Sequence, residues 1–188
     1  MKAIPTAIPD VISIEPKVFG DARGFFFESW NLGEFDAAVG REVRFVQDNH
    51  SGSARGVLRG LHYQQPNPQG KLVNVLEGEV YDVAVDIRAG SPTFARWAAA
   101  ILSAANKRHF WVPPGFAHGF VVLSEFATFT YQCTTLYAAA ADAGIRWNDG
   151  DIGIDWPVST PLLSDKDERA PFLRDVAPGR LPPFEPAG

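Results

Sequence analysis

The sequence predicts an all-β barrel or sandwich. Many short segments rich in β-branched and aromatic residues alternate with turn signals, which include many of the 17 glycines and 15 prolines of this 188-residue chain. Only residues 31–39 carry convincing helix signals, with Asn31 to cap the helix and Gly40 to end it. No internal repeat and no linker divides the chain, so we expect one domain over residues 1–188.

The composition excludes several classes of protein. A net charge of -5 does not suit a nucleic-acid-binding surface, so we expect no nucleic-acid partner. No apolar run is long enough to span a bilayer, and residues 1–10 lack the apolar segment of a signal peptide. The one cysteine, Cys133, excludes an intrachain disulfide and a cysteine-based zinc site. We expect a cytoplasmic protein without a membrane partner.

The first thirty residues are predicted to be extended, because three prolines interrupt them and bar a long helix. Residues 19–24, FGDARG, predict a turn that leads into the aromatic strand FFFESW. The core is the ordinary place for the aromatic run 25–27. Three successive aromatic residues on a strand cannot all face one core, however, so at least one should face a second surface or a ligand.

The middle of the chain is predicted as strands separated by turns. We expect strands at 44–49 and 57–64, with a mobile loop at 51–56 between them. Residues 71–86 give the clearest hairpin signal, because two strand-like apolar runs flank the turn EGE, where Gly78 can adopt a positive φ.

Further strands are expected at 96–102, 110–112, 121–123 and 128–134. The prolines and glycine of PPGFAHGF predict a rigid loop with His118 at its exit. On the last strand Phe129, Tyr131 and Cys133 share one face, so we expect Tyr131 to point inward.

The last fifty residues are predicted to be mostly irregular. Residues 138–143 are expected to form a loop, and 144–156 are rich in turn signals. Charge is concentrated in the run 163–171, LSDKDERAP, and such a run is usually a solvated face. The proline-rich tail from Pro178 is expected to be poorly ordered or to lie on the surface.

Residues 59–64, RGLHYQ, and the nearby Lys71 combine groups that suit one kind of chemistry. His62 can take a proton near neutral pH, Arg59 can bind a phosphate through two hydrogen bonds, and Lys71 can place a charge beside an oxyanion. They predict an enzyme whose phosphorylated substrate loses a proton from carbon; the alternative is a strand end with solvated charges. Strict alternation would put Arg59 and His62 on opposite faces, but Gly60 between them could mark a bulge.

A metal-dependent barrel enzyme is a further alternative. Metal-binding cupins carry two histidines one residue apart and a glutamate, followed by another histidine after a P-x-G loop. This chain keeps the P-x-G-x-x-H piece that ends at His118, but reads HYQ at 62–64, without the second histidine. A catalytic metal needs three or four clustered ligands, so we expect no metal site.

The chain resembles the dTDP-4-dehydrorhamnose 3,5-epimerase family of nucleotide-sugar enzymes. Eight segments carry the resemblance, in order: EPKVFGDARGFFFESW, FVQDNHS, VLRGLHYQ, QGKLV, GEVYDVAVDIR, SPTF, PPGFAHGF and IRWND. The resemblance implies a cupin-type jelly-roll barrel with short peripheral helices, and a homodimer without cofactor or metal. It also implies inversion of C3 and C5 of dTDP-4-dehydro-6-deoxy-D-glucose, giving dTDP-4-dehydro-L-rhamnose for dTDP-L-rhamnose biosynthesis.

The resemblance also implies roles for individual residues. His62 would be the base, held by Asp167, with Tyr131 as the acid on the opposite face and Lys71 near the C4 carbonyl oxygen. Further residues would line the nucleotide-sugar site: Arg23, Glu28, Gln47, Asp48, Asn49, Arg59, His118, Asp142 and Lys166. Phe26 falls where the neighbouring subunit's strand helps to hold the nucleotide, so strand exchange is expected at the site.

The chemistry of the reaction requires the same groups. A 4-keto group acidifies the hydrogens at C3 and C5, because the carbanion delocalises into an enolate. Its formation needs a base, for which His62 is suited, and a cation at the enolate oxygen, for which Lys71 is suited. Inversion needs a proton donor on the other face, such as Tyr131. No redox cofactor is needed, and the sequence holds no glycine-rich dinucleotide fingerprint.

The chain departs from the family after Tyr131, where an aromatic pair and a proline usually precede a glutamate. Here the stretch reads LYAAAAD, which we interpret as alanines after Leu136, with Asp142 in place of the glutamate. Base stacking in this stretch and contacts of residue 142 therefore stay open. Two other functions also stay open: a related deoxysugar 3- or 5-mono-epimerase, and a non-catalytic cupin that binds sugar nucleotides.

Overall fold

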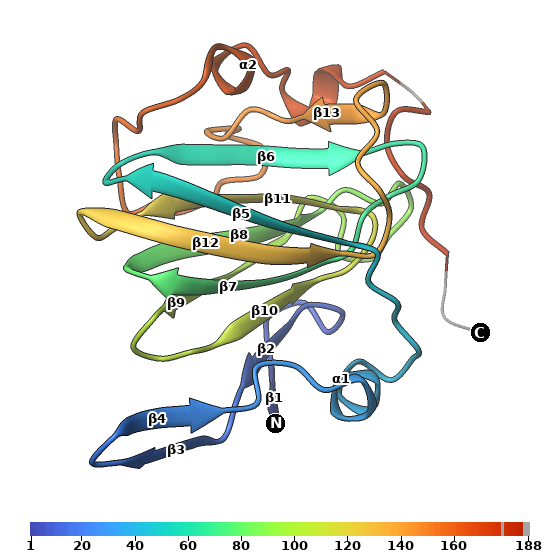
Figure 1. The fold of residues 1–188 in the computed structure, drawn as a ribbon. Helices are drawn as coiled ribbons and strands as arrows, with labels where there is room; N and C mark the ends of the chain where they lie inside the picture. Colours follow the sequence, from blue (N-terminus) through green and yellow to red (C-terminus); the bar gives the residue numbers. More distant parts are fainter. Residues whose placement is uncertain (178, 186–188) are drawn as a thin grey trace.

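The computed structural model describes residues 1–177 and 179–185, and most of its strands form two sheets that face each other (Figure 1). The first sheet has the strand order β1 (Lys2–Pro5), β2 (Ile12–Glu15), β10 (His109–Val112), β7 (Lys71–Glu77), β12 (Phe126–Cys133) and β5 (Gln47–Ala54). The second has the order β13 (Asp142–Gly144), β6 (Leu58–Gln64), β11 (Phe116–Val122), β8 (Glu79–Asp86) and β9 (Trp97–Ser103).

Four further pieces of the described structure lie outside these sheets. Strands β3 (Val18–Asp21) and β4 (Gly24–Phe27) form a separate hairpin below the barrel in Figure 1. The helix α1 (Leu32–Val39) lies near that hairpin, whereas α2 (Asp165–Glu168) and the 3₁₀ turn Leu173–Asp175 lie at the opposite end. The prediction of an all-β fold with short peripheral helices is confirmed. No helix among the described residues is long and apolar enough to cross a membrane.

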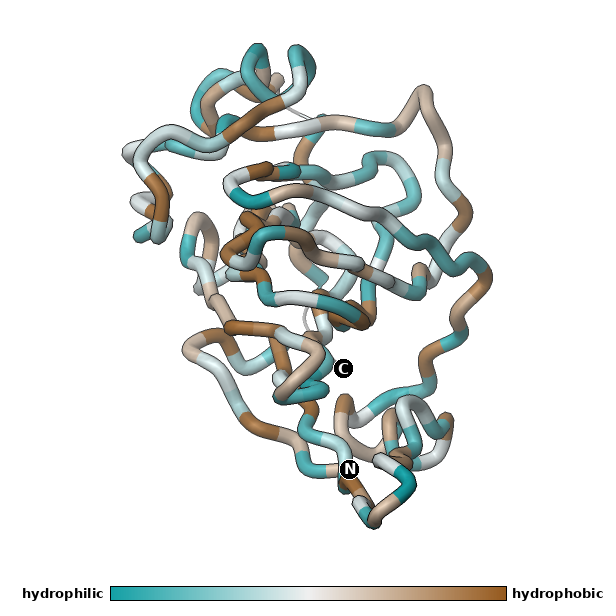
Figure 2. The backbone as a smooth tube through the Cα atoms, turned by 60° about the vertical axis from the view of Figure 1, so that its left-hand side comes forward, coloured by the Kyte–Doolittle hydropathy of each residue, from teal (hydrophilic) through white to brown (hydrophobic). Residues whose placement is uncertain are grey.

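The main core lies between the two sheets. Val73 of β7 and Phe129 of β12 meet Val80 of β8 and Phe120 of β11 in one buried cluster. Along β12 of the first sheet, apolar residues alternate with threonines and a glutamine, and Figure 2 shows brown and teal segments interspersed along the backbone. This alternation buries one side of the strand and leaves the other side for different contacts.

The second sheet is covered on its outer face as well. Val83, Val85 and Ala117 of this sheet pack against Ile145 and Leu173, which come from the C-terminal part of the chain. Both faces of β8 and β11 are therefore buried, and every residue of β11 is buried. A strand covered on both sides reads as a continuous apolar run, which explains why the sequence signal for alternation is weak there.

The predicted helix is confirmed, and so are the residues that begin and end it. The Asn31 side chain accepts a hydrogen bond from the Glu34 backbone N–H at 3.2 Å, and Gly40 ends the helix in the left-handed conformation with φ at 71°. Phe35 is fully buried against Trp111 of β10, with their ring centroids 5.3 Å apart. The helix thus covers the outer face of the first sheet.

The predicted hairpin over residues 71–86 is wrong. Strands β7 and β8 do not pair: β7 pairs with β10 and β12, whereas β8 pairs with β9 and β11. The turn lies at Gly78 as expected, with φ at 77°, but it carries the chain from one sheet to the other. The two apolar runs face each other across the core rather than side by side, a pairing that local turn signals do not determine.

The predicted mobile loop at 51–56 is also wrong, because β5 continues through Ala54 alongside β12. The strand begins at Gln47, so the expected strand at 44–49 is only half correct. A full ladder with β12 overrides the weak local preference of the Ser and Gly residues. Likewise His118 lies within β11, and not at the exit of a loop.

The C-terminal tail lies on the barrel surface over the residues that the structure describes. Ala89 and Pro183 form a parallel bridge, and the Arg88 guanidinium lies 5.0 Å from the centre of the Phe184 ring. Pro178 and residues 186–188, which belong to the same predicted tail, lie outside the described residues.

The turn at Gly78, which carries the chain from one sheet to the other, provides a test of the fold. A Cβ there would lie 2.1 Å from the Phe126 carbonyl oxygen, whereas Gly90, with φ at 88°, has open space around its Cα. We expect Gly90→Ala to lower the free energy of unfolding by about 1–2 kcal/mol, the cost of the left-handed conformation. Gly78→Ala should cost more than about 4 kcal/mol, because the Phe126 backbone must also move. Urea unfolding of both variants measures the difference. Equal losses in the free energy of unfolding would contradict the close contact between Gly78 and the Phe126 backbone.

Candidate active site

A cavity of about 340 Å³ is lined by residues of both sheets. Gln47 and Asn49 of β5, Lys71 of β7 and Tyr131 of β12 line it from the first sheet. The remaining lining residues come from the second sheet, from loops and from α2: His62, Tyr63, Gln64, Gln69, Tyr137, Asp142 and Lys166. Seven of the residues predicted for the site therefore meet in one place, although they are spread from position 47 to position 166.

A bulge at Gly60 directs His62 toward the cavity. His118 and Phe120 of β11 pair with His62 and Arg59, so two residues of β6 stand opposite one of β11. Gly60 has φ at 131°, and a Cβ there would lie 2.6 Å from the Gly119 Cα, so only glycine fits. The bulge left open by the sequence is confirmed.

The bulge also brings Arg59 to the same side of β6 as His62. The Arg59 Nε donates a hydrogen bond to the Ser53 Oγ of β5 at 3.0 Å. Ser53 stands on the same face of β5 as Gln47 and Asn49, which line the cavity. Arg59 does not line the cavity itself, but its guanidinium lies on that side of the sheet.

His62 and Asp167 form a close polar pair beside the cavity. The His62 Nε2 lies 2.5 Å from the Asp167 Oδ1. Asp167 lies in α2, which Ser164 caps, and is buried, while its neighbours Asp165, Lys166 and Glu168 are exposed. The charged run is therefore more than a solvated face, because one carboxylate of the run turns inward.

The charge of Asp167 follows from its contacts. Burial alone would raise the pKa of Asp167, but hydrogen bonds from His62 and Ser164 hold the pKa below its ordinary value. Asp167 is therefore a carboxylate at neutral pH and occupies the Nε2 side of the ring. The Nδ1 of His62 is the ring nitrogen that Asp167 leaves free of this contact.

Lys71 lies at the start of β7, opposite Cys133 in the ladder with β12. Burial lowers the pKa of Lys71, and the charge of Lys166 contributes in the same direction. Nearby acids, Asp82 and Asp142, act against this shift. A lysine in such a place is a strong proton donor to an oxyanion, because its charged form is poorly solvated.

Tyr131 stands on the sheet opposite the one that carries His62. Its ring packs 5.9 Å from that of Phe129, which stacks on Phe120 at 4.1 Å. Burial raises the pKa of Tyr131, so its hydroxyl is protonated at neutral pH. The prediction that Tyr131 points inward is confirmed, and Tyr131 and His62 line the cavity from different sheets.

His118 lies outside the cavity lining. It is buried, and its Nε2 lies 3.0 Å from both carboxylate oxygens of Asp82. Burial lowers the pKa of His118 and raises that of Asp82. Its ring stacks on Phe129 at 6.1 Å, so His118 supports the wall that carries Tyr131.

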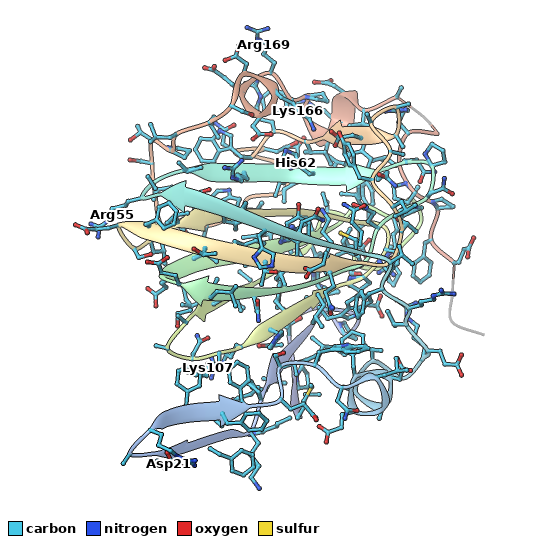
Figure 3. All side chains as sticks on the ribbon, in the orientation of Figure 1. Asp21, Arg55, His62, Lys107, Lys166 and Arg169 are labelled. Carbon is cyan, nitrogen blue, oxygen red and sulfur yellow. The ribbon has the colours of Figure 1, made fainter. Side chains whose placement is uncertain are left out.

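Four other predicted site residues also lie away from the cavity. Asp48 is on the opposite face of β5, in a groove of about 240 Å³ with Phe27 and Trp30. Arg23 and Phe26 belong to the β3–β4 hairpin, and Glu28 follows it. Figure 3 shows His62 and Lys166 in the upper half of the molecule and Asp21 at the tip of the hairpin below.

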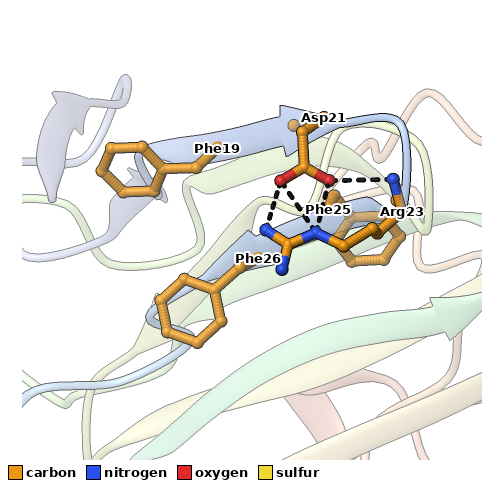
Figure 4. A pocket seen from close by; sticks show the side chains of 7 residues that line it. Phe19, Asp21, Arg23, Phe25 and Phe26 are labelled. Atoms are coloured by element: carbon orange, nitrogen blue, oxygen red, sulfur yellow. Dashed lines mark hydrogen bonds and ion pairs between the residues drawn. The ribbon is translucent and has the colours of Figure 1, made fainter.

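The hairpin presents its aromatic side chains to solvent. Phe25 and Phe26 are 64% and 71% exposed, so a place in the core of this subunit is wrong for both. Figure 4 shows them around Arg23, whose Nε lies 3.1 Å from the Asp21 carboxylate. These residues and Phe19 line a hollow of about 550 Å³.

Four residues that line the cavity were not predicted from the sequence: Tyr63, Gln64, Gln69 and Tyr137. Tyr137 was present in the stretch LYAAAAD and could have been found there. It is 57% exposed at the cavity, and its hydroxyl donates to the Asp142 Oδ2 at 3.2 Å. The same carboxylate pairs with the Lys166 ammonium, so residue 142 does belong to the site.

The donor set of the cavity differs from that of a typical metal centre. No group of three or more His, Cys, Asp or Glu side chains within the described part of the chain is placed to hold a metal ion. The polar groups of the cavity are instead amides, phenols, lysines and one histidine, together with Asp142. Such groups can hydrogen-bond a sugar and move protons.

Comparisons with known proteins identify similar sequences and structures. A sequence model of the family described as dTDP-4-dehydrorhamnose 3,5-epimerase matches residues 5–175. The dTDP-4-dehydrorhamnose 3,5-epimerase of Shigella flexneri is 61% identical over 168 residues, which are 89% of this chain and 93% of that protein.

Solved structures agree with the sequence comparisons. The dTDP-6-deoxy-D-glucose-3,5-epimerase of Legionella pneumophila, in complex with dTDP-4-keto-L-rhamnose, superposes with a TM-score of 0.96 at 50% identity. The match covers 98% of this chain and 99% of that one. A 3'-monoepimerase from Streptomyces bikiniensis, in complex with dTDP-quinovose, gives 0.89 at 37% identity, over 95% and 92% of the two chains.

Proposed function

The chain belongs to the dTDP-4-dehydrorhamnose 3,5-epimerase family, and on that premise we propose how its cavity inverts C3 and C5 of dTDP-4-dehydro-6-deoxy-D-glucose. The protein is an epimerase of dTDP-L-rhamnose biosynthesis, with the cupin-type barrel of its solved relatives. The family match covers residues 5–175, which supports one domain. The single observation that carries the proposed mechanism is the placement of His62 and Tyr131 on facing sheets of one cavity.

His62 is the proposed base. A C–H bond beside the C4 ketone breaks, the proton passes to His62 Nδ1, and the electron pair delocalises to leave an enolate with its charge on the C4 oxygen. The Asp167 carboxylate at 2.5 Å fixes the ring and stabilises the imidazolium that forms. No cofactor is required for this step, because the ketone itself accepts the electron pair.

Lys71 and Arg59 are proposed to act on different parts of the substrate. Lys71 donates a hydrogen bond to the enolate oxygen, where negative charge appears only as the reaction proceeds. Arg59, on the cavity side of β6, binds the diphosphate. Gln47, Asn49 and Lys166 offer further hydrogen bonds along the cavity wall.

Tyr131 is the proposed acid. Its hydroxyl gives a proton to the carbon from the face opposite His62, so a new C–H bond forms with inverted configuration. The phenolate then recovers a proton, and His62 releases the one it had taken, which leaves the enzyme unchanged. Because burial raises the pKa of Tyr131, the donor is protonated at the start of each cycle.

Tyr137 is proposed to hold the nucleobase. Its ring is exposed at the cavity, and an aromatic ring in this position can stack on the flat thymine ring. Asp142 and Lys166 lie beside its hydroxyl and can hydrogen-bond the edge of the base. Base stacking, left open by the sequence, is therefore part of this proposal.

The comparisons favour two inversions over one. The relative with 61% identity is a 3,5-epimerase, whereas the similar structure of a 3'-monoepimerase is only 37% identical. The alternative of a non-catalytic sugar-nucleotide binding protein has less support, because both the base and the acid are present in the cavity. The metal-dependent alternative has less support, because no group of three or more His, Cys, Asp or Glu side chains among the described residues is placed to hold a metal ion.

A homodimer with exchanged hairpins is part of the proposal. Arg23, Phe26 and Glu28 were predicted to contact the substrate, yet they do not line the cavity of their own subunit. The exposed Phe25 and Phe26 give the hairpin an apolar surface that a second copy can cover. We infer that the hairpin enters the partner's site, with Arg23 at the diphosphate and Phe26 at the nucleotide. A cytoplasmic location stays a prediction.

Tyr131→Phe tests the role of the acid. The substitution removes one oxygen and keeps the ring, so the packing on Phe129 should survive. We expect the variant to exchange substrate hydrogens for deuterium in D₂O, because His62 can return a proton to the same face. Formation of inverted product should fall about 10²-fold or more. NMR of the sugar ring reports exchange and configuration together.

His62→Ala is the control for this experiment and should lose both exchange and inversion. If Tyr131→Phe inverts the substrate as fast as the wild-type protein, another group supplies the proton and the proposed role of Tyr131 is wrong.

Subunit mixing tests the exchanged hairpin. We expect Arg23→Ala and His62→Ala homodimers to be nearly inactive, because each lacks one part of both sites. A heterodimer of the two variants would combine His62 of one subunit with Arg23 of the other in one intact site, and so should recover about half of the wild-type activity. Co-expression with two different affinity tags yields this heterodimer for assay. If Arg23 acts within its own subunit, no site of the heterodimer is complete and activity stays lost.

A further inference from the structure

The segment at the cavity that carries Tyr137 is held by three glutamine side chains. The Gln69 Nε2 donates to the Thr135 carbonyl oxygen at 2.7 Å. The Gln47 Oε1 accepts from the Tyr137 backbone N–H at 2.8 Å, and the Gln64 Oε1 accepts from the Ala138 N–H at 2.9 Å. These bonds fix the backbone on which an exposed aromatic ring stands.

Gln64 is the most deeply placed of these side chains and makes the most bonds. It is 4% exposed, and its Nε2 donates to the Leu136 oxygen at 3.3 Å and to the Asn67 oxygen at 2.8 Å. One carboxamide thus joins the end of β6 to two separate loops. Both hydrogens of its Nε2 are used within the protein, so neither is left for a substrate.

The hydroxyl of Tyr137 is held by the residue that pairs with Gln64 in the sheet. Asp142 stands opposite Gln64 in the β13–β6 ladder, and its carboxylate accepts from the Tyr137 hydroxyl at 3.2 Å. Gln64 holds the backbone on both sides of Tyr137 while its cross-strand neighbour holds the tip of the side chain. The ring is therefore fixed at both ends and still 57% exposed.

We propose that Gln64 is a positioning residue that prepares Tyr137 to receive the nucleobase. This inference rests on the proposed stacking role of Tyr137. An exposed ring on a loose loop would lose conformational freedom when the ligand binds, and that loss would weaken binding. Gln64 orders the loop before the ligand binds, so this loss of freedom does not weaken binding, and Gln64 does so without contacting the ligand.

A double-mutant cycle on Gln64 and Tyr137 tests the inference, with dTDP as the ligand and calorimetry as the measurement. Gln64→Met keeps the length of the side chain and removes all three hydrogen bonds. We expect Tyr137→Ala to weaken dTDP binding about tenfold, as loss of base stacking does, and Gln64→Met to weaken it about fivefold. In the double variant the Gln64 change should add less than about twofold, because the ring that it positions is gone.

A matched control separates positioning from general stability. Thr6 likewise holds a loop through its side chain, donating from its hydroxyl to the Ile8 and Val11 carbonyl oxygens, but it does not line the cavity. Thr6→Val should leave the dTDP affinity unchanged even if it lowers the melting temperature. If Gln64→Met does not fold, Gln64→Glu takes its place in the cycle, because it keeps an acceptor for Ala138 and loses both donors.

Each result has a defined meaning. If Tyr137→Ala weakens binding but the Gln64 variant does not, the positioning role is wrong and the stacking role stands. If the Gln64 change weakens binding equally with and without Tyr137, Gln64 acts by another route and the inference is overturned. If Tyr137→Ala leaves dTDP binding unchanged, the stacking proposal fails, and the inference about Gln64 fails with it.

Discussion

The site depends on the hydrogen bond between His62 and Asp167. Burying a carboxylate without a partner costs free energy, so the hydrogen bond that orients His62 also stabilises Asp167 in its buried position. Two local features make the pair possible. Ser164 caps the short helix α2, in which Asp167 is the buried residue. The bulge at Gly60 directs His62 toward the cavity.

The two-sheet barrel provides what an inversion requires, namely groups on both sides of a sugar ring. The proposed base, His62, lies on β6 in one sheet, and Lys71 and the proposed acid, Tyr131, lie on β7 and β12 in the other. Because the sheets are joined by a packed core of alternating side chains, these groups are held at fixed separations. In the proposed mechanism, His62 and Tyr131 therefore act on opposite faces of the sugar from fixed positions.

Much of this arrangement could be predicted from local signals. Strand alternation indicated that Tyr131 points inward, and Asn31 with Gly40 marked the helix, whereas Gly60 allowed a bulge without deciding it. Features that depend on contacts between distant segments could not be predicted. The turn at Gly78 was recognised, but not that it joins different sheets, and the ladder with β12 that makes 51–54 a strand leaves no local signal. For the same reason the link between Gln64 and the Tyr137 segment, 72 to 74 positions away, was missed.

The central claim is that Asp167 makes His62 an effective base, and deuterium exchange into dTDP-4-dehydro-6-deoxyglucose in D₂O measures it most directly. In Asp167→Asn, exchange and inversion should fall together by about 10²- to 10⁴-fold, because the imidazolium loses its carboxylate partner. Asp165→Asn, which changes an exposed acid of the same helix, should exchange at the wild-type rate. A folded Asp167→Asn variant that exchanges as fast as the wild-type protein would contradict the account.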